Sequence, residues 1–179
     1  GSAMDLFAQG NAQLCAKPGR DLDTLSAFDV VLARPELGAD LGRFTGASAI
    51  AELTLRFGRD AADSGLYDAV SGALDAISIA APDAALTATL AGAWRIVAEL
   101  GFAPAVDVCA DCHAPLDPGD TVMFSHRAGG ALCARCGRLV PAGRKLPAPA
   151  RDTLRHFLTD DSLREDRAPL DEASARAHQ

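Results

Sequence analysis

The chain has 179 residues, of which 49% are hydrophobic and 5% aromatic, and its formal net charge is −7. This apolar content excludes an intrinsically disordered protein, and the length suits one domain, or one domain with an appendage. Abundant alanine and few aromatic residues favour helices over sheets. The sequence has no apolar run of 18 residues and no amino-terminal signal segment. We therefore expect a cytoplasmic protein without a membrane span.

The first 32 residues predict β structure that cannot fold alone. Residues 5–16 form a predicted strand, residues 17–21 (KPGRD) a turn, and residues 24–32 either a strand or a short helix. Two or three strands need a partner to be stable. The opening letters GSAM are either an expression scar or the middle of a longer protein, and we expect that part of an N-terminal domain is missing.

Apolar residues at helical spacing predict three helices in the next part of the chain. They lie at residues 47–57, 65–80 and 84–100. Gly101 is placed to end the third helix, and Gly92 allows close approach between helices. Short connections predict an antiparallel bundle. Trp94, the single tryptophan, is expected in the core, with a partner-binding pocket as the alternative.

The sequence changes character after Gly101. Residues 121–125 and 131–133 are candidate strands of a hairpin, joined through a turn that contains two glycines. Residues 140–150 are rich in proline and glycine and predict a linker. A last helix is predicted at 150–158, and the charged residues after it are expected to be frayed.

Four of the five cysteines form two Cys-x-x-Cys pairs, CADC at 109–112 and CARC at 133–136. Each pair directs two thiolates to one point, and the hairpin between them can return the second pair to the first. Four sulfurs arranged in this way typically bind one structural Zn²⁺. The predicted ligands of a single zinc ion are Cys109, Cys112, Cys133 and Cys136.

Other uses of these thiols fit the sequence less well. A thioredoxin-like site needs one such pair at the start of a helix, and an iron–sulfur cluster fits the hairpin spacing less well than zinc. Catalytic zinc keeps an open coordination position. We therefore expect no catalytic residues and no enzyme, with a metal-dependent hydrolase as a minor rival. His113 and Asp111 are expected at the surface or behind the ligands, and Cys15 is an ordinary strand residue.

Positive charge is concentrated beside the second cysteine pair. Residues 127–155 contain seven Lys or Arg and one acidic residue, whereas residues 1–126 contain seven and seventeen. A basic surface on a metal-stiffened hairpin is typical of phosphate binding; the alternative is a merely solvated surface. The predicted DNA contacts are Arg127, Arg135, Arg138, Arg144 and Lys145.

Several stretches together resemble the RecO family of bacterial DNA repair proteins. The most specific are LGFAPAVDVCADCHAPL (100–116) and FSHRAGGALCARC (124–136), which resemble that family's zinc segment. GLYDAVSGALDAI (65–77), AWRIVAELGF (93–102) and LPAPARDTLRHFL (146–158) are similar to its helices. The resemblance covers roughly residues 20–158. His113 is a departure, because it stands where the family often has glycine.

The resemblance implies the domain organisation. Residues 1–32 would be the remnant of an N-terminal OB-fold domain, and residues 33–179 a helical C-terminal domain that includes a zinc module at 105–140. The fold class is then mainly α: an antiparallel helical bundle with an inserted Cys₄ zinc-ribbon-like hairpin and a remnant of N-terminal β structure.

The resemblance also implies a function. Such a protein is a bacterial, nucleoid-associated recombination mediator that binds single- and double-stranded DNA and anneals complementary strands without ATP. It acts with RecR and the single-stranded-DNA-binding protein to load recombinase onto coated strands. No small-molecule substrate is expected. The alternative is a zinc-stabilised protein–protein adaptor without direct DNA binding.

Overall fold

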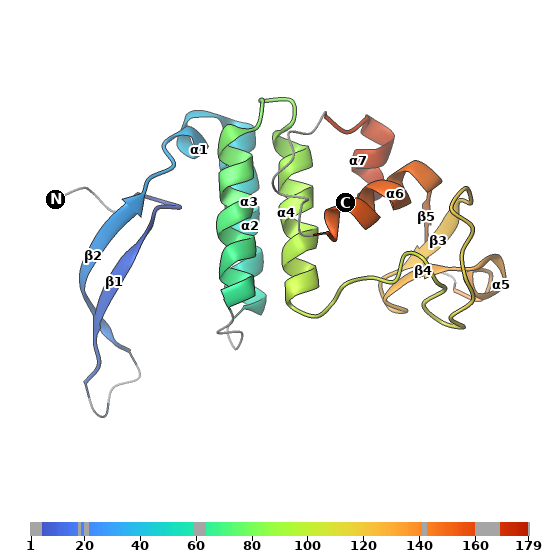
Figure 1. The fold of residues 1–179 in the computed structure, drawn as a ribbon, viewed down its shortest axis with the longest axis horizontal. Coiled ribbons are helices and arrows are strands. Elements are labelled where there is room, and N and C mark those ends of the chain that lie inside the picture. The colour runs from blue at the N-terminus through green and yellow to red at the C-terminus, as the bar shows by residue number, and fades with distance from the viewer. Residues whose placement is uncertain are drawn as a thin grey trace.

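A computed structural model describes residues 5–17, 19, 22–58, 64–140, 143–159 and 169–178. Three parts follow one another along the molecule: a β-hairpin, a helical bundle, and a smaller part in which a sheet lies beside helices (Figure 1). The predicted mainly α fold is confirmed, and the described residues also form two small sheets. Among the described residues, no helix is both long and apolar enough to cross a membrane.

The hairpin consists of two antiparallel strands, β1 (Gln9–Cys15) and β2 (Thr24–Leu32). Of the two alternatives for residues 24–32, the strand is therefore correct. Cys15 lies on β1 and is exposed, as expected of an ordinary strand residue. Part of the predicted turn at 17–21 lies outside the described residues.

The bundle contains a short helix α1 (Glu36–Ala39) and three long helices, α2 (Leu41–Phe57), α3 (Ser64–Ile79) and α4 (Ala85–Glu99). Helix α2 begins six residues before the predicted start at residue 47. The cause is Asp40, whose carboxylate accepts a hydrogen bond of 2.9 Å from the backbone N–H of Arg43 and caps the helix. The apolar spacing alone did not reveal this first turn, which begins with Leu41 and Gly42.

Small residues bring the bundle helices close together. A Cβ atom at Gly92 on α4 would lie 2.6 Å from the Cβ of Ala73 on α3, so only glycine fits this crossing. The predicted role of Gly92 is thus confirmed. Helix α4 ends as predicted at Gly101, which has a φ of 83°. The Phe102 N–H donates to the Val97 carbonyl and the Gly101 N–H to Ala98, which is a Schellman motif.

The smaller part is built on a three-stranded sheet with the order β4-β3-β5. Its strands are β3 (Val122–Ser125), β4 (Gly130–Leu132) and β5 (Arg144–Leu146), and a short helix α5 (Ala134–Gly137) lies between β4 and β5. The hairpin of β3 and β4 is where the sequence predicts it. The linker predicted at 140–150 is wrong in part, because β5 pairs with β3 and α6 (Ala148–Phe157) already begins at residue 148.

The two faces of this sheet pack against different neighbours. Side chains alternate along a strand, and Val122 and Phe124 of β3 join Leu154 of α6 in one buried cluster. Met123 points the other way and packs against the buried cysteines. Trp94 of α4 meets Phe124 edge to face at 6.4 Å, so the core interpretation of Trp94 is confirmed.

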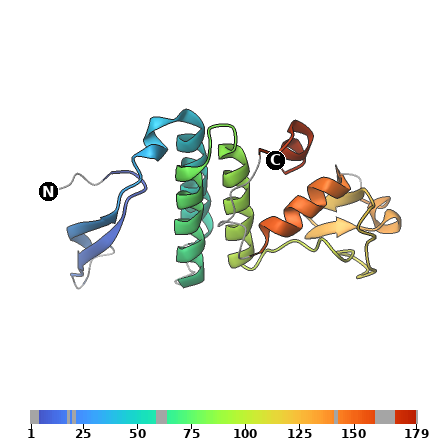
Figure 2. The same ribbon diagram turned by 45° about the horizontal axis from the view of Figure 1, so that its top comes forward.

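The charged C-terminal residues contain a further helix, α7 (Glu172–His178), which the prediction of a frayed tail missed. Helix α7 packs against α6, and contacts α4 and β5 as well. Asp171 caps it by accepting from the backbone N–H of Ser174 at 2.9 Å. In Figures 1 and 2, α7 lies beside α6 close to the carboxyl end of the chain.

Candidate metal centre and cationic surface

The first cysteine pair lies in a tight turn tied to the sheet. The Cys109 N–H donates to the Ala114 carbonyl at 2.8 Å, and the His113 N–H returns to the Cys109 carbonyl at 2.9 Å. The Ala110 N–H reaches the Ala131 carbonyl on β4 at 2.8 Å. These bonds fold the turn back on itself and fix it against the hairpin.

The second pair begins and ends within one helical turn. Cys133 follows β4 and is the N-cap residue of α5, and its carbonyl accepts from the Gly137 N–H at 2.8 Å. Cys136 lies within α5 and is buried, like Cys109 in the first turn. Cys112 and Cys133 are half-buried. The hairpin of β3 and β4 therefore brings the two pairs face to face, as the spacing predicts.

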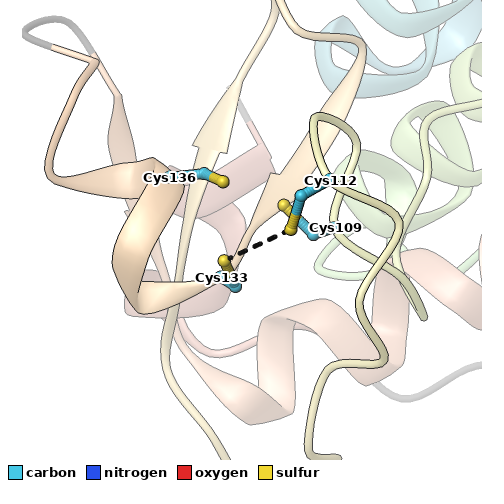
Figure 3. Close-up of side chains that lie close together, drawn as sticks. All are labelled: Cys109, Cys112, Cys133 and Cys136. Atoms are coloured by element: carbon cyan, nitrogen blue, oxygen red, sulfur yellow. Dashed lines mark hydrogen bonds between the residues drawn. The ribbon is translucent and has the colours of Figure 1, made fainter.

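The four sulfur atoms converge on one point (Figure 3). All of them lie within 4.8 Å of one another, and the Sγ atoms of Cys112 and Cys133 are 3.8 Å apart. None of the five cysteines of the chain forms a disulfide. A disulfide would bring two sulfurs to about 2.05 Å, far closer than the sulfurs of Cys112 and Cys133.

This geometry fits a single tetrahedral ion. Zinc–sulfur bonds of about 2.3 Å place the sulfurs of a regular tetrahedron about 3.8 Å apart. The observed spacing matches that edge for Cys112 and Cys133 and stays near it for the whole set. Four thiolates around one ion leave no open position for substrate, so a metal here is structural. The site can hold a metal ion, and the sulfur-only donor set favours a soft or borderline one.

The cysteine thiols differ in how readily they lose their protons. Burial opposes the ionisation of Cys109, but the backbone N–H groups of Cys112, Cys133 and Asp111 face its sulfur and lower its pKa to about 6. The N–H of Cys136 likewise lowers the pKa of Cys133. The Asp111 carboxylate raises the pKa of the Cys136 thiol. A divalent cation overrides this last effect, because a coordinating thiol loses its proton.

The backbone of His113 adopts a conformation that is unusual for a residue with a side chain. Its φ is 59°, in the left-handed region where side chains cost energy and glycine does not. It follows the first Cys-x-x-Cys pair directly and is exposed, as is Asp111, so both agree with the expectation that neither is a ligand. The backbone of this turn therefore favours glycine at position 113.

All five predicted DNA contacts are exposed. The structure nevertheless divides them between the two sides of the sheet. Arg144 stands opposite Phe124 in the register of β5 and β3, and Lys145 stands opposite Met123. By strand alternation, Arg144 emerges on the α6 side and Lys145 on the cysteine side. Arg135 and Arg138 belong to α5 and its C-cap.

Arg135 also interacts with the metal centre itself. The thiolates of Cys112 and Cys136 hydrogen-bond the guanidinium and raise the pKa of Arg135. Four thiolates around a divalent ion leave two negative charges, and a neighbouring guanidinium offsets part of them. Arg135 therefore serves the site as well as the surface.

Two basic residues of the positive stretch do not contribute free positive charge to the cationic surface. Arg151 of α6 is 1% exposed, and its guanidinium donates to the backbone carbonyl of Asp117. Arg155 bonds the carboxylates of Asp107 and Asp152. The local charge of the sequence thus overstates the charge available to a ligand, because counting cannot distinguish free cations from buried or paired ones.

The sequence analysis missed one buried cation, Arg34, at the junction of the hairpin and the bundle. Its side chain is 3% exposed, with Nε 2.7 Å from an Asp75 oxygen on α3. It also donates to the Phe7 carbonyl at 2.8 Å and to the Ser71 hydroxyl at 3.0 Å. An arginine after a strand has no distinctive local pattern, so no sequence signal marks this contact.

Comparison with known proteins agrees with this geometry. Residues 38–177, which contain the bundle and the cysteine cluster, match the family described as "Recombination protein O C terminal". The chain belongs to the RecO family. Proteins named "DNA repair protein RecO" from Anaeromyxobacter sp. (strain K) and Anaeromyxobacter dehalogenans (strain 2CP-1 / ATCC BAA-258) are RecO relatives, each 38% identical over 152 residues. The aligned part is 84% of this chain and 58% of each relative.

Proposed function

We propose that this chain takes part in DNA repair as a recombination mediator that binds DNA through the cationic surface around its metal centre. The observation that supports this most directly is the set of exposed cations on α5 and β5. Among the described residues, no carboxylate forms a salt bridge with Arg138, Arg144 or Lys145. Cations without carboxylate partners can attract phosphates and release counterions.

The metal in this proposal is one structural Zn²⁺, held by Cys109, Cys112, Cys133 and Cys136. Zinc supplies no chemistry here and only stabilises the fold of a segment with a small core of its own. The protein then acts by binding and not as an enzyme. A cytoplasmic location suits it, because reducing conditions keep the thiols available to the metal.

Family membership supports proposing three finer activities. They are binding of both single- and double-stranded DNA, strand annealing without ATP, and action with RecR and the single-stranded-DNA-binding protein. The hairpin of β1 and β2 would form part of an N-terminal OB-fold domain, which agrees with its exposed apolar residues such as Leu14 and Val31. The chain spans 58% of its relatives, so these activities belong to the whole protein.

Salt-dependent binding to a labelled single-stranded oligonucleotide tests the DNA-binding proposal. Reversal of Arg127, Arg135 and Arg138 to Glu removes three exposed cations from the turn between β3 and β4 and from α5 with its C-cap. Fluorescence anisotropy should then show weaker binding, and the slope of log K against log salt should become shallower by about 2. The matched control reverses the exposed residues Lys17, Arg56 and Arg176, which gives the same change in net charge.

Equal losses in the two triple variants would mean that only net charge matters and that no specific surface exists. Unchanged binding in both would favour the adaptor. That second function is supported by a separate observation on α2, where Leu41 and Phe44, three residues apart on the helix, are 77% and 38% exposed. Neighbouring exposed apolar side chains of this size are typical of a protein–protein contact.

A further inference from the structure

A second polar site lies on the opposite side of the small sheet from the cysteines. It is a cavity with a volume of about 20 Å³, formed where the end of β3, strand β5 and helix α7 meet. Phe124, Leu146 and Leu154 form its apolar wall. The polar side chains around it are those of His126, Arg144 and His178, and Lys145 of β5 also lines it.

His178 is a buried polar side chain whose role is not explained by the packing around it. It is only 8% exposed, and neither Nδ1 nor Nε2 has a hydrogen-bond partner among the residues that the structure describes. Its ring packs on Phe157 at 5.5 Å, so α7 and α6 fix its position. Leaving a buried polar group without a hydrogen-bond partner is unfavourable. Burial also lowers the pKa of His178, which keeps the ring neutral with one N–H to donate.

The charge around the cavity is positive. None of the described residues that line it is acidic, and Arg144 has no carboxylate partner in the described part of the chain. Arg144 emerges on this side of the sheet because it stands opposite Phe124. His126 lies at the mouth, with its ring 5.2 Å from that of Phe124. The site therefore combines N–H donors, a cation and no competing anion.

We propose that this cavity binds one oxygen of a phosphate group, with His178 and His126 as N–H donors and Arg144 as the counter-charge. The volume admits a group the size of one oxygen and not a whole metabolite. The remainder of the phosphate then lies outside, beside the exposed guanidinium of Arg144. Guanidinium groups suit phosphate because their donors lie in a planar fork.

The phosphate can belong to a nucleic-acid backbone or be a free anion, and the chemistry of the site is the same for both. Assigning the phosphate to nucleic acid rests on the proposed function, whereas phosphate binding by the cavity does not depend on it. The cations reversed in the DNA test lie on the turn between β3 and β4 and on α5 with its C-cap, and none of them lines the cavity. Failure of that test and failure of this site are therefore separate results.

NMR of the histidine rings in the zinc-loaded chain provides the test. Inorganic phosphate is titrated at pH 7.5 and constant ionic strength, with chloride as the balancing anion. We expect a saturable shift of the His178 signals, with a smaller shift at His126. Arg144→Ala should weaken the apparent affinity about tenfold, since a charge-assisted contact is lost. Arg138→Ala, which removes an exposed arginine outside the cavity, should leave it unchanged.

A second titration uses a short single-stranded oligonucleotide. A His178 shift at lower concentration than with phosphate, reduced by Arg144→Ala, assigns the site to a nucleic-acid backbone. A shift with phosphate alone assigns it to a free anion; both results support the site. Bound phosphate should also raise the unfolding temperature of the wild-type chain. His178→Phe keeps the ring packing and should abolish this increase. Absence of a saturable shift with both probes, or an identical response in Arg144→Ala, would overturn the proposal and leave the cavity to water.

Discussion

Replacing His113 by glycine should strengthen metal binding. The residue has a φ of 59° in the turn that presents Cys109 and Cys112, and a non-glycine residue in this region costs about 1–2 kcal/mol. Glycine removes that cost but loses about 0.5–1 kcal/mol through the greater freedom of the unfolded chain. The net gain is about 0.5–1 kcal/mol. His113 is exposed and is not a ligand in the cysteine set, so its ring contributes little to offset the gain.

The gain should appear as metal affinity, because folding of this segment and metal binding are coupled. We expect His113→Gly to hold zinc about two- to fivefold more tightly in competition with a chromophoric chelator. His113→Ala is the matched control, since it removes the same ring but keeps a Cβ at positive φ. The reasoning is refuted if alanine and glycine strengthen binding equally, or if glycine gives no gain.

Three further predictions follow from single residues. Cys133→Ser should abolish stoichiometric zinc by elemental analysis and speed amide exchange across β3 and β4, with α2–α4 unchanged; retained zinc would contradict the four-cysteine site. Because burial lowers the pKa of His178 in the fold, the unfolded chain takes up the proton first as pH falls below about 6.5. Unfolding temperatures should therefore fall between pH 7 and pH 5 more steeply in the wild type than in His178→Phe, and parallel curves would exclude this linkage. Arg34→Met should destabilise the chain by about 1–3 kcal/mol in denaturant titrations, since it leaves the Phe7 carbonyl and Asp75 without their partner; Arg56→Met, at an exposed pair, should change it little.

The features that the sequence predicted correctly depend on local signals. The cysteine pairs converge because each turn is short and the intervening hairpin has its own glycines. Gly129 illustrates this, since it adopts a φ of 79° in the turn between β3 and β4. The long helices follow from apolar spacing, and Gly101 ends α4 because it adopts a positive φ. Such residues specify structure without reference to distant parts of the chain.

The features that the sequence did not predict depend on distant partners. Strand β5 is three residues long and exists because β3 pairs with it, so its proline- and glycine-rich context predicts only a linker. Helix α7 is different, because a local signal was present. Asp171 is placed as an N-cap and Glu172 lies in the first turn, which together indicate a helix start within the charged tail.

Strand β3 connects the metal centre to both proposed phosphate-binding surfaces. Met123 packs against the cysteine cluster, and a Cβ at Gly137 or Gly143 would lie within 2.9 Å of its side chain. These two glycines flank the segment that leads from α5 to β5. The neighbouring residue Phe124 belongs to the opposite cluster and lines the cavity of His178. Because adjacent residues of one strand serve both faces, loss of the metal should disturb the cations on both sides of the sheet. The bundle has a separate core and should be spared.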